Sequence, residues 1–323
     1  LKSPWSMVRL DSGSTRVGER DSARILELQA DGSVREVATV EGVAPGGEGG
    51  LLGLEVGDGS LFAYYTAADD NRVERFALEG DAGSYSLGAG TVILDGLAKA
   101  GNHDGGRIKL GPDGDLYVTV GDAGDPQRAQ DLDSPNGKIL RIGVDGSVPA
   151  DNPFPGSPVY SYGHRNPQGI AWDADGQLWA AEFGQDQWDE FNRIEPGRNY
   201  GWPVVSYGID YGRSLITPFT RMPGMEEPFL VWTPSIAPAG LALYDGDLFP
   251  QWRGSLFVAA LAEESLRRVP IENGEPGEQE ILLKEVGDRI RDVRVGPDGA
   301  IYVLTDESDG RIVQLPADVL TGG

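Results

Sequence analysis

Residues 107–120 read Arg-Ile-Lys-Leu-Gly-Pro-Asp-Gly-Asp-Leu-Tyr-Val-Thr-Val, and residues 293–304 read Val-Arg-Val-Gly-Pro-Asp-Gly-Ala-Ile-Tyr-Val-Leu. Both stretches place a Gly-Pro-Asp-Gly turn between two short apolar runs. Asp-Gly between such runs is a strong hairpin signal, because type I′ turns need positive φ at both central residues. Each stretch is followed by a third strand-like run that carries Arg, at 138–142 and at 311–315. The two copies predict a repeated antiparallel unit.

The same unit recurs along the rest of the chain. Its other copies are centred on the turns Asp11-Ser12-Gly13, Asp58-Gly59, Asp175-Gly176 and Asp245-Gly246. Six units at intervals of roughly 45–75 residues have the size of β-propeller blades. We therefore predict an all-β fold, a six-bladed β-propeller that forms a single domain over residues 1–323. The first copy is degenerate, so a five-bladed propeller is the alternative.

The composition agrees with a turn-rich globular chain. The 323 residues include 47 Gly and 22 Pro, and 39% of them are apolar, which is enough to bury a core. The formal net charge is −24. Such a charge repels phosphate backbones and anionic lipids, so we expect no nucleic-acid partner. No apolar run approaches the about 18 residues that a membrane-spanning helix needs, so we expect no transmembrane segment.

Cysteine is absent, which excludes thiol catalysis, disulfides and Cys-ligated metal sites. A core of this size does not need disulfides, so an extracellular location is compatible with the sequence. The chain starts at Leu1-Lys2-Ser3 without Met. We therefore expect a removed leader and a secreted or periplasmic, cell-envelope protein, although a chain trimmed for expression would look the same.

The only two histidines lie in Gly- and Asn-rich stretches that break the strand pattern. His103 is in Asn102-His103-Asp104-Gly105-Gly106, and His164 is followed directly by Arg165 and Asn166. Each stretch precedes the first strand of a repeat, and in a propeller such loops converge on one rim of the channel. His103 is our candidate general base, because an imidazole titrates near working pH. The alternative for both histidines is a side chain that only satisfies turn carbonyls.

Asp122 follows the second strand of the same repeat as His103, in Val120-Gly121-Asp122-Ala123-Gly124. A carboxylate that leaves a strand into a Gly turn can reach across and orient an imidazole. We therefore predict that Asp122 pairs with His103. An Asx turn, in which the carboxylate only caps its own loop, is the alternative.

Two arginines precede the last repeat, in Asp288-Arg289-Ile290-Arg291-Asp292. Alternate residues of a strand point to the same face, so Arg289 and Arg291 would lie side by side. Their charges repel unless an anion or acidic side chains balance them. In so acidic a protein the pair predicts an anionic ligand. The alternative is an ion-pair ladder with Asp288 and Asp292.

Two further loops are candidates for binding. Gly46-Gly47-Glu48-Gly49-Gly50 brings backbone close to a neighbour, but it lacks the Lys-Ser/Thr and the helix of a phosphate loop. A bend between repeats is its alternative interpretation. Residues 182–190 contain four acidic side chains and could offer oxygens to Ca²⁺. The spacing does not fit an EF-hand, and a solvated acidic loop is the alternative.

Together these motifs resemble the soluble PQQ-dependent glucose and aldose sugar dehydrogenases, the glucose/sorbosone dehydrogenase family. The resemblance extends from Pro4-Trp5 to Thr305-Asp306. It rests on the Glu48 loop, the His103 and Asp122 motifs, Gly163-His-Arg-Asn-Pro-Gln-Gly169, Asn199-Tyr-Gly-Trp-Pro203, Ser235–Gly240 and the Arg289–Arg291 pair. The family fold is a six-bladed propeller, which agrees with the count of repeats.

The resemblance implies oxidation of the C1 hydroxyl of an aldose sugar to the lactone, with hydride passing to the quinone of PQQ. His103 would take the hydroxyl proton, Asp122 would orient His103, and Arg165 would stabilise negative charge on the quinone oxygen. The cofactor would be bound by Glu48, His103, Arg165, Asn166, Arg289 and Arg291. The implied partners are an aldose sugar substrate and an external electron acceptor, with the loop at 208–227 as the rim of the substrate site.

The same resemblance implies calcium. One Ca²⁺ would be bound together with PQQ by the backbone carbonyls of Gly184 and Gln185. A second, structural Ca²⁺ would lie near Tyr207, Asp210 and Glu227. The chain departs from the family pattern at three positions: Ala262 replaces a common Lys, Glu48 replaces the Gln of glucose-oxidising members, and Gln185 replaces a common Pro.

Two other functions compete with this one. A Ca²⁺-dependent lactonase or esterase would need a cluster of Asp, Glu and Asn ligands in the channel and would have no use for an Arg pair. A propeller that has lost its cofactor and binds a protein or glycan would explain Ala262 and Glu48. The presence of His103, Asp122 and the arginines argues against that loss.

Overall fold

The Gly-Pro-Asp-Gly stretch at 111–114 forms a β-hairpin in the structure, a computed structural model that describes residues 1–10, 12–29 and 31–316. The Gly111 N–H donates to the Asp115 carbonyl at 2.8 Å, and Gly114 takes a φ of +84°. The loop therefore has three residues and ends in a left-handed glycine. The predicted type I′ turn at Asp113-Gly114 is wrong here, because the Gly114 N–H donates to the Gly111 carbonyl at 3.0 Å and Asp113 has no positive φ. The central residues of the turn are thus Pro112 and Asp113, and proline favours the first of these positions in a type I turn. The type I′ form occurs at Asp58-Gly59, where φ is +50° and +65°.

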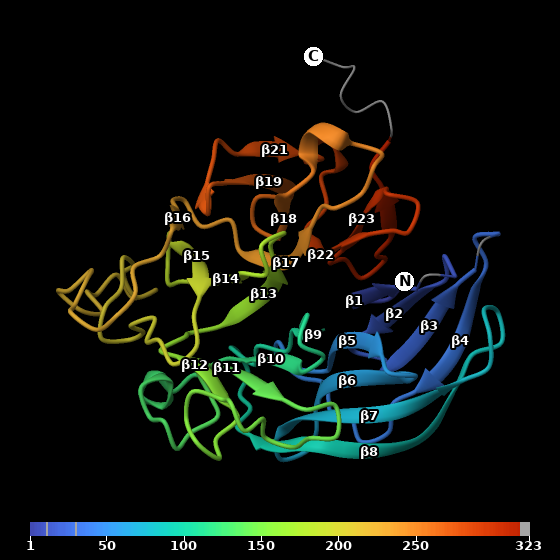
Figure 1. The fold of residues 1–323 in the computed structure, drawn as a ribbon, viewed down its shortest axis with the longest axis horizontal. Coiled ribbons are helices and arrows are strands. Elements are labelled where there is room, and N and C mark those ends of the chain that lie inside the picture. The colour runs from blue at the N-terminus through green and yellow to red at the C-terminus, as the bar shows by residue number, and fades with distance from the viewer. Residues whose placement is uncertain (11, 30, 317–323) are drawn as a thin grey trace.

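Within the described residues, six antiparallel sheets follow one another along the chain and form the blades of a propeller (Figure 1). The all-β, six-bladed prediction is confirmed. The degenerate first repeat is a complete four-stranded blade, although Asp11 of its predicted turn lies outside the described residues. The five-bladed alternative is therefore wrong.

Each blade is built from strands that are consecutive in sequence. The first three blades consist of β1 (Pro4–Arg9), β2 (Thr15–Glu19), β3 (Arg24–Leu28) and β4 (Val34–Thr39); of β5 (Leu51–Gly57), β6 (Ser60–Thr66), β7 (Asn71–Glu79) and β8 (Ser86–Leu97); and of β9 (Ile108–Leu110), β10 (Leu116–Val120), β11 (Lys138–Ile142) and β12 (Val159–Tyr162).

The last three blades differ more in size. The fourth consists of β13 (Pro167–Trp172), β14 (Leu178–Glu182), β15 (Asp189–Ile194) and β16 (Leu230–Trp232). The fifth has β17 (Pro238–Leu243), β18 (Ser255–Ala260), β19 (Ser265–Glu272), β20 (Glu275–Pro276) and β21 (Glu280–Leu282). The sixth has three strands, β22 (Ile290–Val295), β23 (Ile301–Thr305) and β24 (Ile312–Gln314).

The hydrophobic core lies in the seams between neighbouring blades. One cluster, for example, joins Phe62 and Tyr64 of the second blade to Val118 and Leu140 of the third. Inner strands approach closely where one of them carries glycine: a Cβ on Gly169 would lie 2.1 Å from the carbonyl oxygen of Ala239. Glycine there is a requirement of blade packing.

The first strand of five blades is irregular near its start. The pairing register shifts in β1, β5, β13, β17 and β22. A β-bulge changes the direction of the side chains beyond it. All five bulges lie at the same end of the propeller, because each is at the beginning of an inner strand, and this is the end that carries the candidate site.

Helices contribute little. The described part of the chain holds three short 3₁₀ helices, Pro126–Ala129, Pro250–Trp252 and Lys284–Val286. Among the described residues no helix has the length and apolar character needed to cross a membrane.

Candidate functional site

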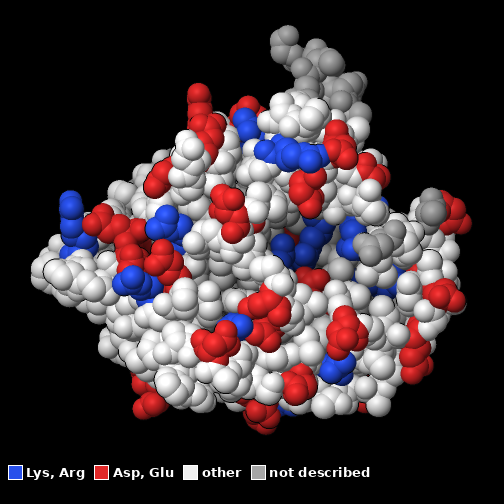
Figure 2. Space-filling view, in the orientation of Figure 1, with Lys and Arg blue, Asp and Glu red and all other residues white. Residues whose placement is uncertain are grey.

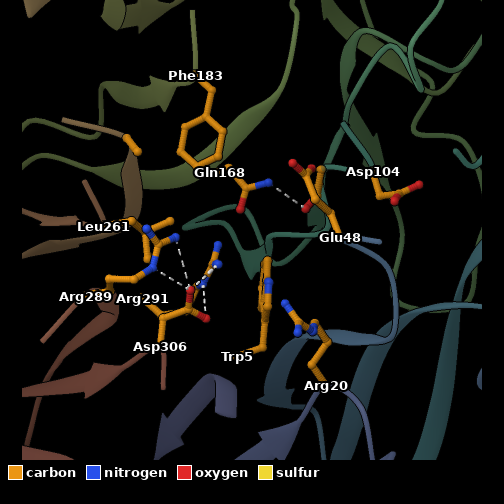
Figure 3. Close-up of a pocket in the computed structure, with 12 residues that line it drawn as sticks. Trp5, Arg20, Glu48, Asp104, Gln168, Phe183, Leu261, Arg289, Arg291 and Asp306 are labelled. Atoms are coloured by element: carbon orange, nitrogen blue, oxygen red, sulfur yellow. Dashed lines mark hydrogen bonds and ion pairs between the residues drawn. The ribbon is translucent and has the colours of Figure 1, made fainter. Parts of the chain in front are cut away.

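A cavity of about 210 Å³ lies where the inner strands begin and the second strands of the blades end. Figure 2 shows a hollow in the middle of this face, with basic side chains inside it and acidic ones around it. The polar lining includes Arg20, Glu48, Asp104, Gln168, Arg289, Arg291 and Asp306. The rest of the lining is Trp5, Gly105, Phe183, Ala237 and Leu261 (Figure 3).

Arg289 and Arg291 share one carboxylate. The Arg291 Nη2 lies 2.9 Å from Asp306 Oδ2, and the Arg289 Nε lies 3.3 Å from the same oxygen. Burial by itself would raise the pKa of Asp306, but the two guanidinium groups outweigh it and lower that pKa. The predicted side-by-side placement is therefore confirmed. The ladder with Asp288 and Asp292 is wrong, because those carboxylates pair with Arg311 and Arg107.

Two guanidinium groups lie close to the Trp5 ring. The Cζ of Arg107 is 4.4 Å from the ring centroid, and that of Arg291 is 5.7 Å away. Burial lowers the pKa of Arg107 to about 10, so this side chain stays charged at neutral pH. Each of these two arginines also has a carboxylate partner, since Arg107 pairs with Asp292 at 3.2 Å and Arg291 with Asp306 at 2.9 Å.

His103 and Asp122 form the predicted pair. The His103 Nδ1 lies 2.7 Å from Asp122 Oδ1, and Asp122 Oδ2 accepts a hydrogen bond of 2.9 Å from the indole N–H of Trp202. Asp122 also caps its own loop by accepting from the Gly124 N–H at 2.9 Å. Its carboxylate therefore performs both predicted roles. With Nδ1–H donating to Asp122, the Nε2 of His103 is left as a proton acceptor.

His103 adjoins the cavity through Glu48. The Glu48 Oε2 accepts a hydrogen bond of 2.7 Å from the backbone N–H of His103, and Glu48 lines the cavity. The His103 side chain is 11% exposed, and its Nε2 has no partner among the described residues. The next residue, Asp104, also lines the cavity, and burial raises its pKa.

Arg165 and Asn166 lie just outside the cavity lining. The Arg165 guanidinium donates to the Phe183 carbonyl at 3.2 Å and to Gln185 Oε1 at 3.1 Å, and no carboxylate of the described chain lies within salt-bridge distance of it. Asn166 Oδ1 accepts from the Gly105 N–H at 3.0 Å. The Arg165 Nε and the Asn166 Nδ2 are buried without a partner in the described part of the protein, so both retain hydrogen-bonding capacity.

His164 has a structural role. It is completely buried, with Nδ1 at 2.8 Å from Glu182 and Nε2 at 2.8 Å from Ser161, and its ring stacks on Tyr200 at 4.8 Å. Both ring nitrogens are satisfied by protein. The alternative of a purely structural histidine is therefore correct for His164, while His103 keeps a free nitrogen.

The predicted calcium ligands fall into two groups. The Gln185 carbonyl accepts a turn hydrogen bond of 3.2 Å from Trp188 N–H, and the Gly184 N–H donates to Asp189. Tyr207 lies near Glu227, which together with burial raises the Tyr207 pKa, while the Asp210 carboxylate caps its own loop at Tyr211. In the described ranges no group of three or more His, Cys, Asp or Glu side chains is arranged to hold a metal. Both calcium sites stay predictions.

Several residues of the site received no role from the sequence, among them Arg20, Gln168, Trp202 and Asp306. Trp202 and Gln168 belong to motifs that carry the family resemblance. The sequence therefore indicated that they lie near the site, but not which residues they contact. Asp306 and Arg20 follow β23 and β2 directly, at the end of the propeller that holds the site. Arg20 and Asp306 could have been predicted only from the rule that the second strand of each blade ends at the side of the propeller that holds the site.

Comparison with known proteins agrees with this geometry. Residues 1–314 match the family described as Glucose / Sorbosone dehydrogenase. The chain is 40% identical to the aldose sugar dehydrogenase YliI of Escherichia coli over 67% of its own length and 60% of that protein's length.

Solved structures give the same result over more of the chain. The PQQ-bound aldose sugar dehydrogenase of Streptomyces coelicolor is similar at 38% identity and a TM-score of 0.85, covering 97% of this chain and 94% of that one. The soluble aldose sugar dehydrogenase of Escherichia coli, solved in the apo form, is similar at 32% identity and a TM-score of 0.91, covering 97% and 96%.

Proposed function

This chain belongs to the glucose/sorbosone dehydrogenase family, and on that basis we propose that it oxidises aldose sugars at C1 with PQQ as its bound cofactor. One observation supports this most strongly. A histidine with one nitrogen fixed by a carboxylate and the other free adjoins a cavity lined by three arginines, in a protein of net charge −24.

The residues of the cavity fit PQQ, a planar ortho-quinone with three carboxylates. Arg20, Arg289 and Arg291 supply cations for the carboxylates. The buried Nδ2 of Asn166 and Nε of Arg165 have hydrogen bonds left to donate. Gly105 also lines the cavity, and its missing Cβ lets the backbone pack against β10, where a Cβ would lie 2.6 Å from the Thr119 carbonyl oxygen. When bound, the cofactor would supply a quinone that accepts hydride from C1 of the sugar.

The chain's own residues would handle the proton and the charge. His103 Nε2 would accept the proton of the C1 hydroxyl, and Asp122 would hold the imidazole in the tautomer that leaves Nε2 free and would stabilise the imidazolium. Arg165, fixed by the Phe183 carbonyl and Gln185, would place a cation against the negative charge that develops opposite the sugar. Glu48 fixes the backbone at His103 and would thereby keep the imidazole in place.

Calcium and the remaining partners are part of the same proposal. We assign one Ca²⁺ to the carbonyls of Gly184 and Gln185 beside the cofactor, and a structural Ca²⁺ to Tyr207, Asp210 and Glu227. The electrons would pass to an external acceptor, and the secreted or periplasmic location stays a prediction. The lactonase stays the second interpretation, and it would have no use for the pair Arg289 and Arg291 that lines the cavity.

Reconstitution tests the proposal. The purified protein is incubated with Ca²⁺ and PQQ, and dye-linked oxidation of a panel of aldoses is measured for the wild type and for His103→Ala. We expect turnover that requires PQQ and that falls by about 10²- to 10⁴-fold in the variant, as for loss of a general base. Absence of PQQ-dependent turnover with every aldose would leave the binding propeller as the better account.

A further inference from the structure

Arg20 is the one arginine of the cavity that no sequence motif indicated. It follows β2 directly and lines the cavity together with Arg289 and Arg291 of the sixth blade. Figure 3 shows Arg20 on one side of Trp5 and the two other arginines on the opposite side. A ligand that spans the cavity would therefore meet cations at both ends.

The glycine-rich stretch explains how Arg20 is held. The Arg20 N–H donates to the Ser3 carbonyl, and its own carbonyl accepts from the Leu51 N–H, both at 2.9 Å. A Cβ on Gly50 would lie 2.4 Å from the Arg20 carbonyl oxygen and 2.7 Å from its Cγ. Gly50 thus leaves room for the backbone and the stem of Arg20 to pack against the second blade. The predicted close approach of this loop to a neighbour is found here.

The guanidinium of Arg20 is only partly used by the protein. Its Nε and Nη2 donate to the adjacent Asp21 at 2.8 and 3.3 Å. This pair is open to solvent, with side chains 25% and 52% exposed, and such pairs contribute little to stability. The Nη1 has no hydrogen-bond partner among the described residues. Arg20 therefore has a donor available for a ligand.

The arginines at the two ends of the cavity have different carboxylate partners. Asp306 partly neutralises Arg289 and Arg291, whose guanidinium groups both contact it. The hydrogen bond to Asp21 is the main reason that the pKa of Arg20 is raised, and the carboxylates of Asp306 and Glu48 add to it. The Arg20 charge is therefore felt inside the cavity as well as at its rim.

We propose that Arg20 binds a carboxylate of the cofactor, at the end of the cavity opposite Arg289 and Arg291. This inference rests on the proposed function and adds a binding residue from the first blade.

The test is the dissociation constant of PQQ, measured without sugar by calorimetry in the presence of Ca²⁺. Removal of one charged hydrogen bond in Arg20→Gln should weaken binding by about tenfold to a hundredfold. Arg72→Gln is the matched control, because Arg72 makes the same two-nitrogen contact to Asp70 at 29% exposure and does not line the cavity. It should leave the constant within about twofold of the wild type.

A second variant should change the affinity for PQQ in the opposite direction. Asp21 competes for the guanidinium, so Asp21→Asn should tighten PQQ binding by a few-fold, on the order of one weak surface pair. If Arg20→Gln binds PQQ with the affinity of the wild type, the proposed role of Arg20 is wrong. If Arg20→Gln does not fold, Asp21→Asn decides, and an unchanged dissociation constant for PQQ in that variant would also overturn the role. If the wild type itself binds no PQQ, the proposed function fails together with this inference.

Discussion

At the scale of single residues, the central unit is the chain of contacts from Trp202 through Asp122 to His103. Two residues of these loops are in unusual backbone conformations: φ is +60° at His103 itself and +53° at Ala123, the residue after Asp122. Non-glycine residues adopt positive φ at a cost of about 1–3 kcal/mol. The surrounding contacts, such as Ala123 N–H to the His103 carbonyl at 3.2 Å, hold both loops in this form.

Trp202→Phe should slow turnover while preserving the fold. The substitution keeps an aromatic side chain at a position whose ring lies 5.6 Å from Arg165 in the wild type, and it removes the donor to Asp122 together with part of the ring system. A hydrogen bond to a charged group is worth about 1.5–3 kcal/mol, so we expect a loss in kcat of about tenfold or more with little change in KM. Trp179→Phe is the control, because it removes the equivalent bond of 2.8 Å to Asp173 away from the cavity. Equal kcat losses in both variants would contradict a positioning role for Trp202.

Residue types in local motifs were predictable, while contacts between distant segments were not. His103 and Asp122 could be paired from sequence because they flank the two strands of one hairpin. Asp306 could not be assigned to Arg289 and Arg291, since nearby Asp288 and Asp292 offered the same charge. Arg20 was missed for a related reason: its environment is created by Gly50 of the next blade.

At the scale of elements, the repeated hairpin was the most predictable feature. Asp-Gly turns between apolar runs predicted the strands. They did not predict the turn type at 112–114, where the turn closes from Gly111 to Gly114 and places Pro112, not Asp113, at its first central position. The bulges at the start of five inner strands were not predicted, because a one-residue register shift leaves the apolar pattern nearly unchanged. Three of these strands, β1, β13 and β22, provide Trp5, Gln168 and Arg291 to the cavity.

The first blade depends on a buried ion pair between β2 and β3. Arg16 and Glu27 are 0% exposed and 3.2 Å apart, and Glu27 also accepts from Arg35 at 2.6 Å. Burial alone would raise the pKa of Glu27, but Gly83 N–H, Arg35, Ser14 and Arg16 together lower it below its ordinary value. A carboxylate with a lowered pKa stabilises the fold above its unfolded pKa, and that stability is lost as pH falls through the folded pKa.

Glu27→Gln should therefore lower the free energy of unfolding by about 3 kcal/mol at pH 7, because it leaves Arg16 buried without its charge partner. The difference from wild type should shrink below about pH 4, where the wild-type carboxylate becomes protonated in the unfolded chain and then in the folded one. Urea unfolding of the wild type and the variant at pH 7 and below about pH 4 measures this difference in the free energy of unfolding. A difference that does not change with pH would contradict the ion-pair account.

At the scale of the whole molecule, six seams of apolar side chains hold the blades in a ring. The ring closes between the sixth and the first blade, where Leu1 and Gly310 exchange two backbone hydrogen bonds of 3.0 and 2.7 Å. The number of blades could be read from the repeats. The closure could not, because it joins residues that are 309 positions apart.

Gly310→Ala should weaken this closure. A Cβ at Gly310 would lie 2.5 Å from Cγ of the Pro4 ring, and overpacking of this kind costs about 1–3 kcal/mol. We expect the melting temperature to fall by several degrees, on the order of 2–4 °C for each kcal/mol. Gly212→Ala is the control, since its Cβ meets only the Asp210 carboxylate at 3.6 Å. An unchanged melting temperature for Gly310→Ala would show that the seam adapts without cost.

The ring of blades brings His103 to an arginine-lined cavity, which we propose binds a redox cofactor. The most direct test of this claim is a single turnover, in which PQQ-loaded protein is mixed with an aldose without oxygen or electron acceptor and the absorbance of the cofactor is followed. We predict reduction of one equivalent in the wild type, and a rate at least about 10²-fold lower in His103→Ala at equal cofactor occupancy. Equal rates in the two proteins, or no reduction in either, would contradict the account.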